Sequence, residues 1–334
     1  MRSSGVAREG LLLVIIWCTS GSLPSAAFAR LPAGSVSGDG QRERQLVSEL
    51  KEAGRDGNWF KAERLLSKYT GCAAAVFTAA LAVAYRCGRY QEGAQIHDRF
   101  RVEHAPADAA FQTEAIKIFT KLHAFGRVRQ LWDEALLTQT VSASLLSARL
   151  AAAAAEGDLD GAEAVLQEMY SVGITPDVTH FNAAILACEN SDKFTPAAMF
   201  LFEAMLAQGV MPNITTLTTL TACYSAAPLT DVLSIGARVE AFGLRADSAF
   251  AEAYTCAILG LRRNKRTYGR SWSTLAQTLE NLSTERKAAA RRAISHLRAN
   301  GVKLPRSCQI VAAKLFFPGA ALKVSTKTWP KAGG

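Results

Sequence analysis

Apolar side chains recur at helical spacing through most of the chain, and short turn sequences interrupt them at regular intervals. One stretch places Val165, Leu166 and Met169 on a single helical face, as apolar residues three to four positions apart do. It ends in the sequence GITPD at residues 173–177, where the glycine stops a helix and the proline prevents its continuation. The next such helix ends in GVMPN at residues 209–213. The pattern therefore predicts paired helices that are separated by a repeated turn.

These turns divide much of the chain into similar units. A unit of 34 to 36 residues that holds two helices occurs five times, at residues 74–108, 109–142, 143–177, 178–213 and 214–247. The second unit matches the pattern least well, and its turn is expected at Gly126. A partial unit at 43–73 precedes the array and an atypical helical cap at 248–300 follows it, as expected of stacked repeats, because their end units must cover a continuous core. The chain is thus predicted to be all-α.

The first 27 residues have the pattern of a secretory signal peptide. A short apolar run between Leu11 and Trp17 follows two arginines and precedes small residues that suit cleavage. The run is shorter than the roughly 20 apolar residues that span a membrane, so a buried helix is the alternative, and no later stretch has a transmembrane pattern.

Cleavage before Phe28 would expose residues 28–42, a transit-like or flexible segment. This arrangement resembles the bipartite presequence of algae with complex plastids. We therefore expect a plastid protein that arrives by the secretory route and has no membrane association after cleavage; secretion and a mitochondrial address are the alternatives.

Charge is divided unevenly along the chain. The formal net charge is +9, yet residues 261–334 contain 16 Lys and Arg against 2 Asp and Glu, and residues 74–247 contain 12 against 19. A basic C-terminal region thus follows an acidic body, and residues 301–334 are expected to form a disordered basic tail. This region includes basic and aromatic residues suited to a phosphate backbone or a stacked base, with a solvated basic face as the alternative. We call them the basic cluster: Arg262, Arg263, Lys265, Arg266, Tyr268, Arg270 and Trp272.

Units 143–177 and 178–213 share two motifs. The closing turn reads Gly, an apolar residue, any residue, Pro, and then Asp or Asn, and the second helix carries Ala, Val or Leu, Leu or Phe, and Met at fixed spacing. These motifs resemble those of the pentatricopeptide repeat family in its plain P-type form. The tetratricopeptide family has repeats of similar length, but its Trp-Leu-Gly-Tyr pattern is not found here. The resemblance implies a right-handed α-solenoid of helix-turn-helix repeats; a generic α-solenoid that contacts proteins is the alternative.

The resemblance also implies a function. Proteins of this family bind single-stranded RNA in organelles, and two side chains of each repeat contact the edge of one base. The matching residues near the start of each first helix, called here the first-helix readers, are Thr78, Thr113, Ser147, Asn182 and Thr218. Those at the end of each unit, called here the closing readers, are Asp108, Ser142, Asp177, Asn213 and Asp247. All ten are small and form hydrogen bonds, although helix capping favours the same residue types and is the alternative reason for them.

The chemistry of these pairs suggests a base order. An ionised Asp only accepts hydrogen bonds, which suits the two donors on the pairing edge of guanine, whereas an Asn both donates and accepts, which suits a pyrimidine. By the family's scheme the five units imply G, an unassigned base, G, a pyrimidine and G, with Thr218 and Asp247 as the clearest pair. The family usually sandwiches each base with a branched apolar residue, and the matching residues here are mostly smaller: Ala75, Ala110, Ser144, Thr179 and Thr215. The array is also net negative, and the basic cluster is the candidate for supplying the phosphate contacts that RNA affinity depends on.

Catalysis is not expected. The sequence contains no phosphate-binding loop, no HExxH and no CxxC pair, and no Asp follows Asp247, so neither a metal nor another cofactor is predicted. The histidines lack ligand spacing and are assigned to packing or to the surface: His97, His104, His123, His180 and His296. The chain is predicted to be a monomer that binds organellar RNA and assists transcript processing, stability or translation, in contact with other RNA-processing or ribosomal proteins. The alternative is a scaffold or assembly factor for an organellar ribosome or photosynthetic complex.

Overall fold

The computed structural model describes residues 38–102, 107–190, 195–261 and 279–316. All regular structure in these ranges is α-helical, and the chain is an all-α helical repeat solenoid. It divides into two compact parts, residues 1–193 and residues 194–334, which we call the N-terminal part and the C-terminal part and describe separately. None of the described helices is long and apolar enough to cross a membrane.

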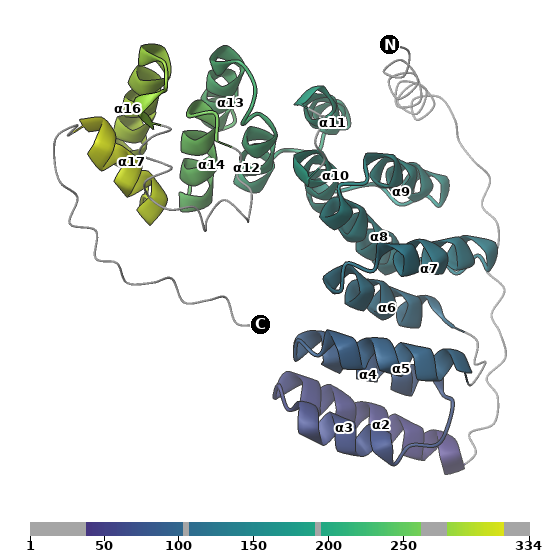
Figure 1. Cartoon of the computed structure of the whole chain (residues 1–334). Helices are drawn as coiled ribbons and strands as arrows, with labels where there is room; N and C mark the ends of the chain where they lie inside the picture. Colours follow the sequence, from purple (N-terminus) through teal and green to yellow (C-terminus); the bar gives the residue numbers. More distant parts are fainter. Residues whose placement is uncertain (1–37, 103–106, 191–194, 262–278, 317–334) are drawn as a thin grey trace. The chain divides into compact units, whose positions relative to one another are not determined.

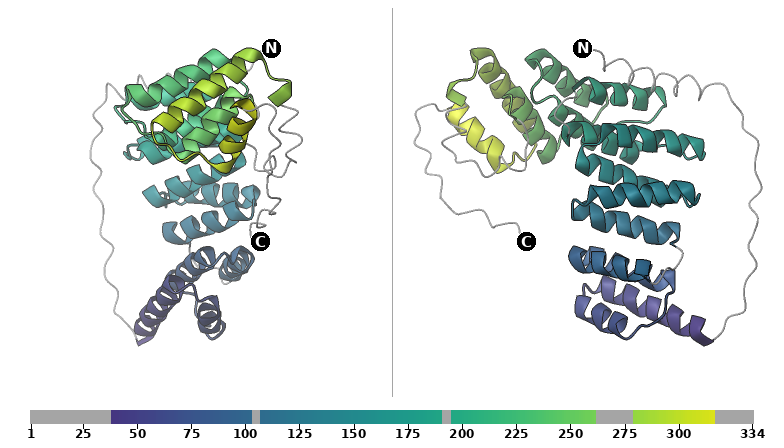
Figure 2. Two further views of the ribbon diagram at one scale, coloured as in Figure 1. Left: turned by 90° about the vertical axis from the view of Figure 1, so that its left-hand side faces the viewer. Right: turned by 45° about the vertical axis from the view of Figure 1, so that its right-hand side comes forward.

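The N-terminal part is a stack of helix pairs (Figures 1 and 2). Its helices are α2 (Gly38–Arg55), α3 (Trp59–Ser67), α4 (Ala74–Arg86), α5 (Tyr90–Val102), α6 (Ala109–Lys121), α7 (Phe125–Leu137), α8 (Ala143–Glu156), α9 (Leu159–Ser171) and α10 (Val178–Asn190). The first helices of successive units, α4, α6, α8 and α10, each pack against the next one. Helices α4, α6 and α8 also pack against the second helix of their own unit. The stacking therefore brings the N-terminal turns of the first helices into one row.

Glycine ends the second helices of three units, as the sequence predicts. Gly173, Gly209 and Gly243 have φ angles of 73°, 72° and 63°, in the left-handed region where a side chain would be strained. After Gly173 the backbone N–H of Ile174 donates to the carbonyl of Met169 at 2.8 Å, which satisfies a carbonyl of the last helical turn. These glycines set the length of the second helix in these three units.

Unit 109–142 uses different residues for its turns. The sequence predicts a turn at Gly126, and this prediction is wrong, because Gly126 lies inside α7. The chain turns instead at His123, with a φ of 55°, and it leaves α7 at Gln139, with a φ of 53°. Both are side-chain-bearing residues in the left-handed region, where glycine is more stable. This unit was the poorest match to the repeat pattern because it lacks the glycines that mark the other turns.

Aromatic side chains fill the core between units 74–108 and 109–142. The rings of Phe77 and Phe100 are 5.2 Å apart between centroids, and those of Phe100 and Phe111 are 4.0 Å apart. The buried His97 ring stacks on Phe111 with a centroid distance of 5.6 Å.

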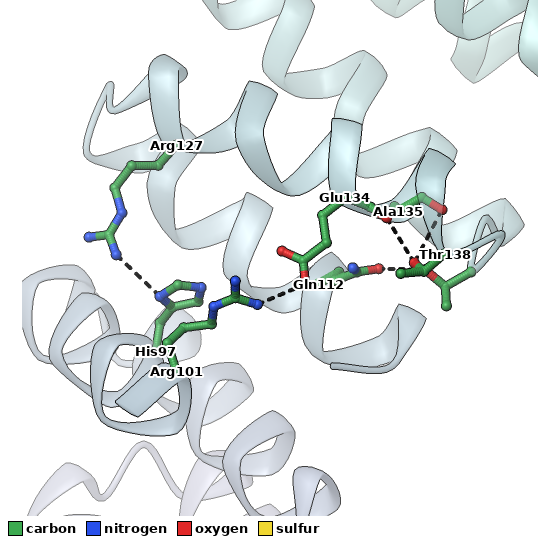
Figure 3. A network of polar contacts seen from close by, with 8 residues as sticks. His97, Arg101, Gln112, Arg127, Glu134, Ala135 and Thr138 are labelled. Atoms are coloured by element: carbon green, nitrogen blue, oxygen red, sulfur yellow. Dashed lines mark hydrogen bonds and ion pairs between the residues drawn. The ribbon is translucent and has the colours of Figure 1, made fainter. Parts of the chain in front are cut away.

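Polar contacts hold α5 against α7 at the edge of this core (Figure 3). Arg101 Nη1 lies 2.7 Å from Glu134 Oε1, and Arg127 Nη2 lies 3.2 Å from His97 Nδ1. These two side-chain contacts thus join α5 to α7.

The C-terminal part contains six described helices: α11 (Thr195–Ala207), α12 (Ile214–Cys223), α13 (Leu229–Ala241), α14 (Ser248–Ile258), α16 (Thr284–Ala299) and α17 (Arg306–Phe316). Helices α12 and α14 pack side by side, as the first helices do in the N-terminal part, and α16 packs against α14.

The disordered tail predicted from residue 301 onward is wrong for residues 306–316. These residues form α17, which buries Cys308, Val311, Ala312 and Leu315 against α16 and α14. The apolar residues recur at helical spacing, so their burial outweighs the basic composition of the segment. The end of the tail, residues 317–334, lies outside the described residues.

Candidate nucleic-acid interface

Four closing readers are helix N-caps. Each stands one residue before the first helix of the following unit, and its side-chain oxygen accepts a hydrogen bond from a backbone N–H three residues later. The distance from the side-chain oxygen to the donating backbone nitrogen is 2.7 Å for Asp108, 3.3 Å for Ser142, 2.9 Å for Asn213 and 2.7 Å for Asp247. An Asp cap uses one carboxylate oxygen in this bond. Capping and base contact are therefore compatible, because the second oxygen is left for another donor.

The first-helix readers with a hydroxyl share a different contact. Each donates its hydroxyl proton to the carbonyl four residues earlier, at 2.6 to 2.8 Å, in Thr78, Thr113, Ser147 and Thr218. A hydroxyl has one proton and two lone pairs. These side chains therefore offer only acceptor capacity to a partner outside the helix as long as this bond is kept.

The readers differ in exposure. Ser147 is exposed, and Thr78 and Asn182 are half-buried. Thr113 and Thr218 are only 3% and 7% exposed. The pair that is clearest in the sequence, Thr218 with Asp247, thus combines a buried hydroxyl with an exposed carboxylate. All five residues at the sandwich position, one residue into each first helix, are exposed: Ala75, Ala110, Ser144, Thr179 and Thr215.

Unit 143–177 is the place where the structure joins two readers. His180 lies between them: its Nε2 atom is 2.9 Å from Ser147 Oγ, and its Nδ1 atom is 2.7 Å from Asp177 Oδ1. The sequence predicts only a packing or surface role for His180, because the histidines lack ligand spacing. Ser147 is 33 residues away and belongs to the preceding unit. The sequence held one indication of this role, the position of His180 in the repeat. His180 is the third residue of its first helix, and the third residues of the other first helices are Val76, Phe111, Leu145 and Thr216.

Asp177 is ionised at neutral pH. Partial burial alone would raise the pKa of its carboxyl group, but hydrogen bonds from Thr179 and His180 outweigh this effect and hold the pKa below its usual range. Oδ1 accepts from the Thr179 backbone at 2.9 Å, from the Thr179 hydroxyl at 2.6 Å and from the His180 backbone at 3.1 Å. Asp177 therefore presents a negative, acceptor-only group beside Ser147.

The basic cluster of residues 262–272 lies outside the described residues. Basic residues that follow it in sequence make structural contacts instead. The Arg286 guanidinium donates to the carbonyls of Ile258, at 2.8 Å, and Ala227, at 3.0 Å, and Arg291 Nε donates to the Leu315 carbonyl at 2.9 Å. Part of the C-terminal charge thus stabilises the ends of neighbouring segments. In the described part of the chain, no group of three His, Cys, Asp or Glu side chains has an arrangement that would hold a metal ion.

The fold defines the class of this protein as an α-helical repeat protein. Residues 146–191, which cover most of unit 143–177 and α10, match the model of the pentatricopeptide repeat domain. The match falls on the two units whose motifs resemble that family and supports a pentatricopeptide repeat at residues 146–191 of this 334-residue chain.

Similar solved structures belong to longer proteins. The crystal structure of the pentatricopeptide repeat protein PPR10 in complex with an 18-nt psaJ RNA element has a TM-score of 0.45 and 16% sequence identity, over 80% of this chain and 45% of that chain. The crystal structure of PPR10 from maize has a TM-score of 0.39 and 15% identity, over 94% of this chain and 57% of that chain. The chain thus spans about half the length of these proteins. No curated protein matches the sequence.

Proposed function

We propose that the chain binds single-stranded RNA through the N-terminal turns of its first helices, with one base per unit, as a sequence-selective protein that assists transcript processing, stability or translation in an organelle. One observation carries the proposal. Helices α4, α6, α8 and α10 pack side by side, so their N-terminal turns form a row in which units 74–108, 109–142 and 143–177 each contribute one first-helix reader and one closing reader. Small hydrogen-bonding groups at a regular interval suit a strand of successive bases.

The pair Thr78 and Asp108 provides a test. Thr78 is half-buried, its hydroxyl proton is held by the Ala74 carbonyl, and Asp108 is an exposed carboxylate, so both offer acceptors to guanine. Changing both to Asn adds donors and installs the combination found at Asn182 and Asn213. We expect the preference at the first base of the site to move from G to a pyrimidine while total affinity changes little. The expected change in relative binding free energy at that base is about 1–3 kcal/mol, which is the cost of one wrong base in direct readout on DNA.

The measurement is selection of the full chain against a random RNA pool. A matched control changes Thr120 and Asp133 to Asn, which makes the same chemical changes away from the readers; the Thr120 hydroxyl also donates four residues back, to Ile116 at 2.7 Å. The control should enrich the wild-type sequences. If wild type and the reader variant enrich the same RNAs, or neither enriches any, the base-reading assignment fails.

A protein scaffold is the second candidate, and exposed apolar side chains favour it. Phe60 on α3, Leu137 at the end of α7 and Met211 before α12 are 76%, 86% and 67% exposed. Their substitution by polar residues should abolish capture of a protein partner if the scaffold function is right, and should leave RNA selection unchanged if the RNA function is right. Positive potential along the row of readers would favour RNA, since phosphate contacts need it.

The organelle is proposed from the presequence alone. A fluorescent fusion of residues 1–45 should enter a complex plastid, and the Phe28→Ala variant should remain outside it. Secretion of the wild-type fusion into the medium would overturn the plastid assignment and leave the RNA-binding proposal to be judged separately.

A further inference from the structure

We propose that His180 determines the base preference of unit 143–177, because it holds both readers of that unit, Ser147 and Asp177, as hydrogen-bond acceptors. This inference rests on the RNA-binding function proposed above and adds a third residue to the unit, contributed by the first helix of the next unit.

The Ser147 hydroxyl fixes the direction of the contact with His180. Ser147 Oγ donates its proton to the Ala143 carbonyl at 2.8 Å, and it lies 2.9 Å from His180 Nε2. As long as the hydroxyl proton stays on the Ala143 carbonyl, Nε2 has to be the donor in the second contact, which requires a ring tautomer with a proton on Nε2. The neighbouring helices α8 and α10 position the two residues, since they pack directly against each other. His180 therefore prevents Ser147 from turning its proton outward.

The second ring nitrogen contacts Asp177. Nδ1 lies 2.7 Å from Asp177 Oδ1 and 3.2 Å from the Asp177 backbone nitrogen. The proposal requires a proton on Nε2, because a ring whose only proton is on Nδ1 would accept from the Ser147 hydroxyl instead.

The groups left for a base are then two acceptors. One lone pair of Ser147 Oγ is not used by Ala143 or His180. The Asp177 contacts within the described residues fall on Oδ1, which leaves Oδ2 for an external donor. The pairing edge of guanine carries two adjacent donors, whereas that of adenine carries one donor and one acceptor. The arrangement thus favours guanine, because an acceptor that faces the adenine ring nitrogen is repelled.

His180 is mostly buried, with 14% of its side chain exposed, and it replaces residues that fill the same position elsewhere. The corresponding side chain of unit 109–142, Phe111, is fully buried. An aromatic ring without donors is therefore accommodated at this position of the fold, which supplies a conservative variant for a test.

The trio consists of the residue types of a hydrolase triad, but it differs from one in the direction that we propose for the Ser147 hydroxyl. In such a triad the histidine accepts the proton of the serine hydroxyl. In the arrangement that we propose, the Ser147 proton goes to the Ala143 carbonyl, and His180 donates to the oxygen. The arrangement presents acceptors rather than activating a nucleophile.

The test compares His180→Phe with His180→Gln in the full chain. The phenylalanine removes both ring nitrogens, whereas the glutamine keeps an N–H donor at the place of Nε2. The probe is a pair of RNAs that carry the base order implied by the five units and differ only in G or A at the third position. We expect wild type and His180→Gln to prefer G, and His180→Phe to lose about fivefold of this preference, which corresponds to one net hydrogen bond. Preferences at the other positions should not change.

A double-substitution cycle shows whether His180 acts through Ser147. Ser147 is exposed, so Ser147→Ala should fold, and it should reduce the G preference by itself. Adding His180→Phe to Ser147→Ala should then cost less of the G preference than it does in the wild type, because only the contact with Asp177 is left to lose. An undiminished G preference in His180→Phe, an equal loss in both His180 variants, additive losses in the cycle, or a wild type that selects other bases but not G at this position would overturn the inference. A wild type that selects no RNA would overturn the proposed function itself.

Discussion

The Arg149 guanidinium lies buried beside Asp158, with Nη2 3.1 Å from Oδ2, and only 3% of the arginine is exposed. Gly161 makes this arrangement possible. A Cβ atom at Gly161 would lie 2.7 Å from Arg149 Nη2 and closer still to the Asp158 carboxylate, which also accepts the Gly161 N–H at 2.9 Å.

The Gly161→Ala variant should lower the free energy of unfolding by about 1–3 kcal/mol, the usual cost of forcing an extra group into a packed site. Gly126→Ala is the matched control, because a Cβ there meets no atom within 4 Å and Gly126 lies in a helix. It should be neutral or stabilise the chain by up to about 1 kcal/mol. Urea unfolding followed by circular dichroism measures both. Equal stabilities of the two variants would show that the contacts at Gly161 do not constrain α9.

Two substitutions of Asp108 should distinguish its role as a helix cap from a contact with a base. Asp108→Ala removes the acceptor for the Phe111 N–H and should cost about 1 kcal/mol of stability. Asp108→Asn keeps a good cap and should leave stability within about 0.5 kcal/mol of wild type. The same unfolding measurement applies. A large loss of stability in the Asn variant would show that the charge itself stabilises α6, and the RNA selection would then need a correction for unfolded protein.

The buried ring of His97 should make the stability depend on pH. Burial lowers the pKa of His97, although the neighbouring Asp98 carboxylate opposes this effect. The folded chain therefore disfavours the protonated ring, and the unfolded chain, with a pKa near 6.5 at this residue, binds more protons at mildly acidic pH. The free energy of unfolding should be highest above about pH 6.5 and should fall as the pH drops toward the folded pKa.

His97→Phe keeps an aromatic ring against Phe111 and removes the titrating group. Its unfolding free energy should depend less on pH between 7.5 and 5.5 than that of wild type, whatever its absolute stability. Unfolding in urea at several pH values gives both slopes. Parallel slopes would show that other groups cause the pH dependence.

Turns that require one particular residue type could be predicted from the sequence. Glycines such as Gly173 mark left-handed turns because other residues are strained there. The turns at His123 and Gln139 gave no such signal, since these residue types are not specific for the left-handed conformation that they adopt. Helix α17 was missed because a basic composition was weighted above the apolar face that contains Val311 and Leu315.

The positions of the candidate site residues could be predicted from the sequence, but their burial and contacts could not. The position of each reader followed from the repeat, whose period is a property of the sequence. The burial of Thr113 and the contact between His180 and Ser147 did not, because both depend on the first helix of a neighbouring unit. Contacts across 33 residues arise from the stacking of helices and leave no local pattern.

Arg286 should stabilise the fold of the C-terminal part. Its two terminal nitrogens reach the carbonyls of Ala227, Ile258 and Ala257, at 3.0, 2.8 and 3.3 Å, from one planar group. Lysine keeps the charge but concentrates its donors at one atom, so Arg286→Lys should lose most of these bonds and destabilise the chain by about 1–3 kcal/mol. Lys287→Arg, at the neighbouring position, is the control. Unchanged thermal unfolding of Arg286→Lys would show that the guanidinium contacts contribute little.

The basic cluster should contribute to RNA binding by neutralising phosphates. Deletion of residues 261–300 is not a clean test, because it removes Arg286 and the buried face of α16. Substitution of Arg262, Arg263, Lys265 and Arg266 by Gln removes charge alone. Binding should weaken for all sequences alike, and the slope of log affinity against log salt should flatten by roughly 0.7 for each phosphate of a single strand that the variant no longer neutralises.

The control for this variant removes the same number of charges elsewhere, at four exposed basic residues of α2: Arg42, Arg44, Lys51 and Arg55. Both variants change the net charge equally, so a general electrostatic effect would alter their salt slopes to the same extent. A flatter slope confined to the cluster variant assigns the phosphate contacts to residues 262–266. An unchanged slope would make the cluster a solvated surface, and RNA affinity would then depend on the row of readers alone.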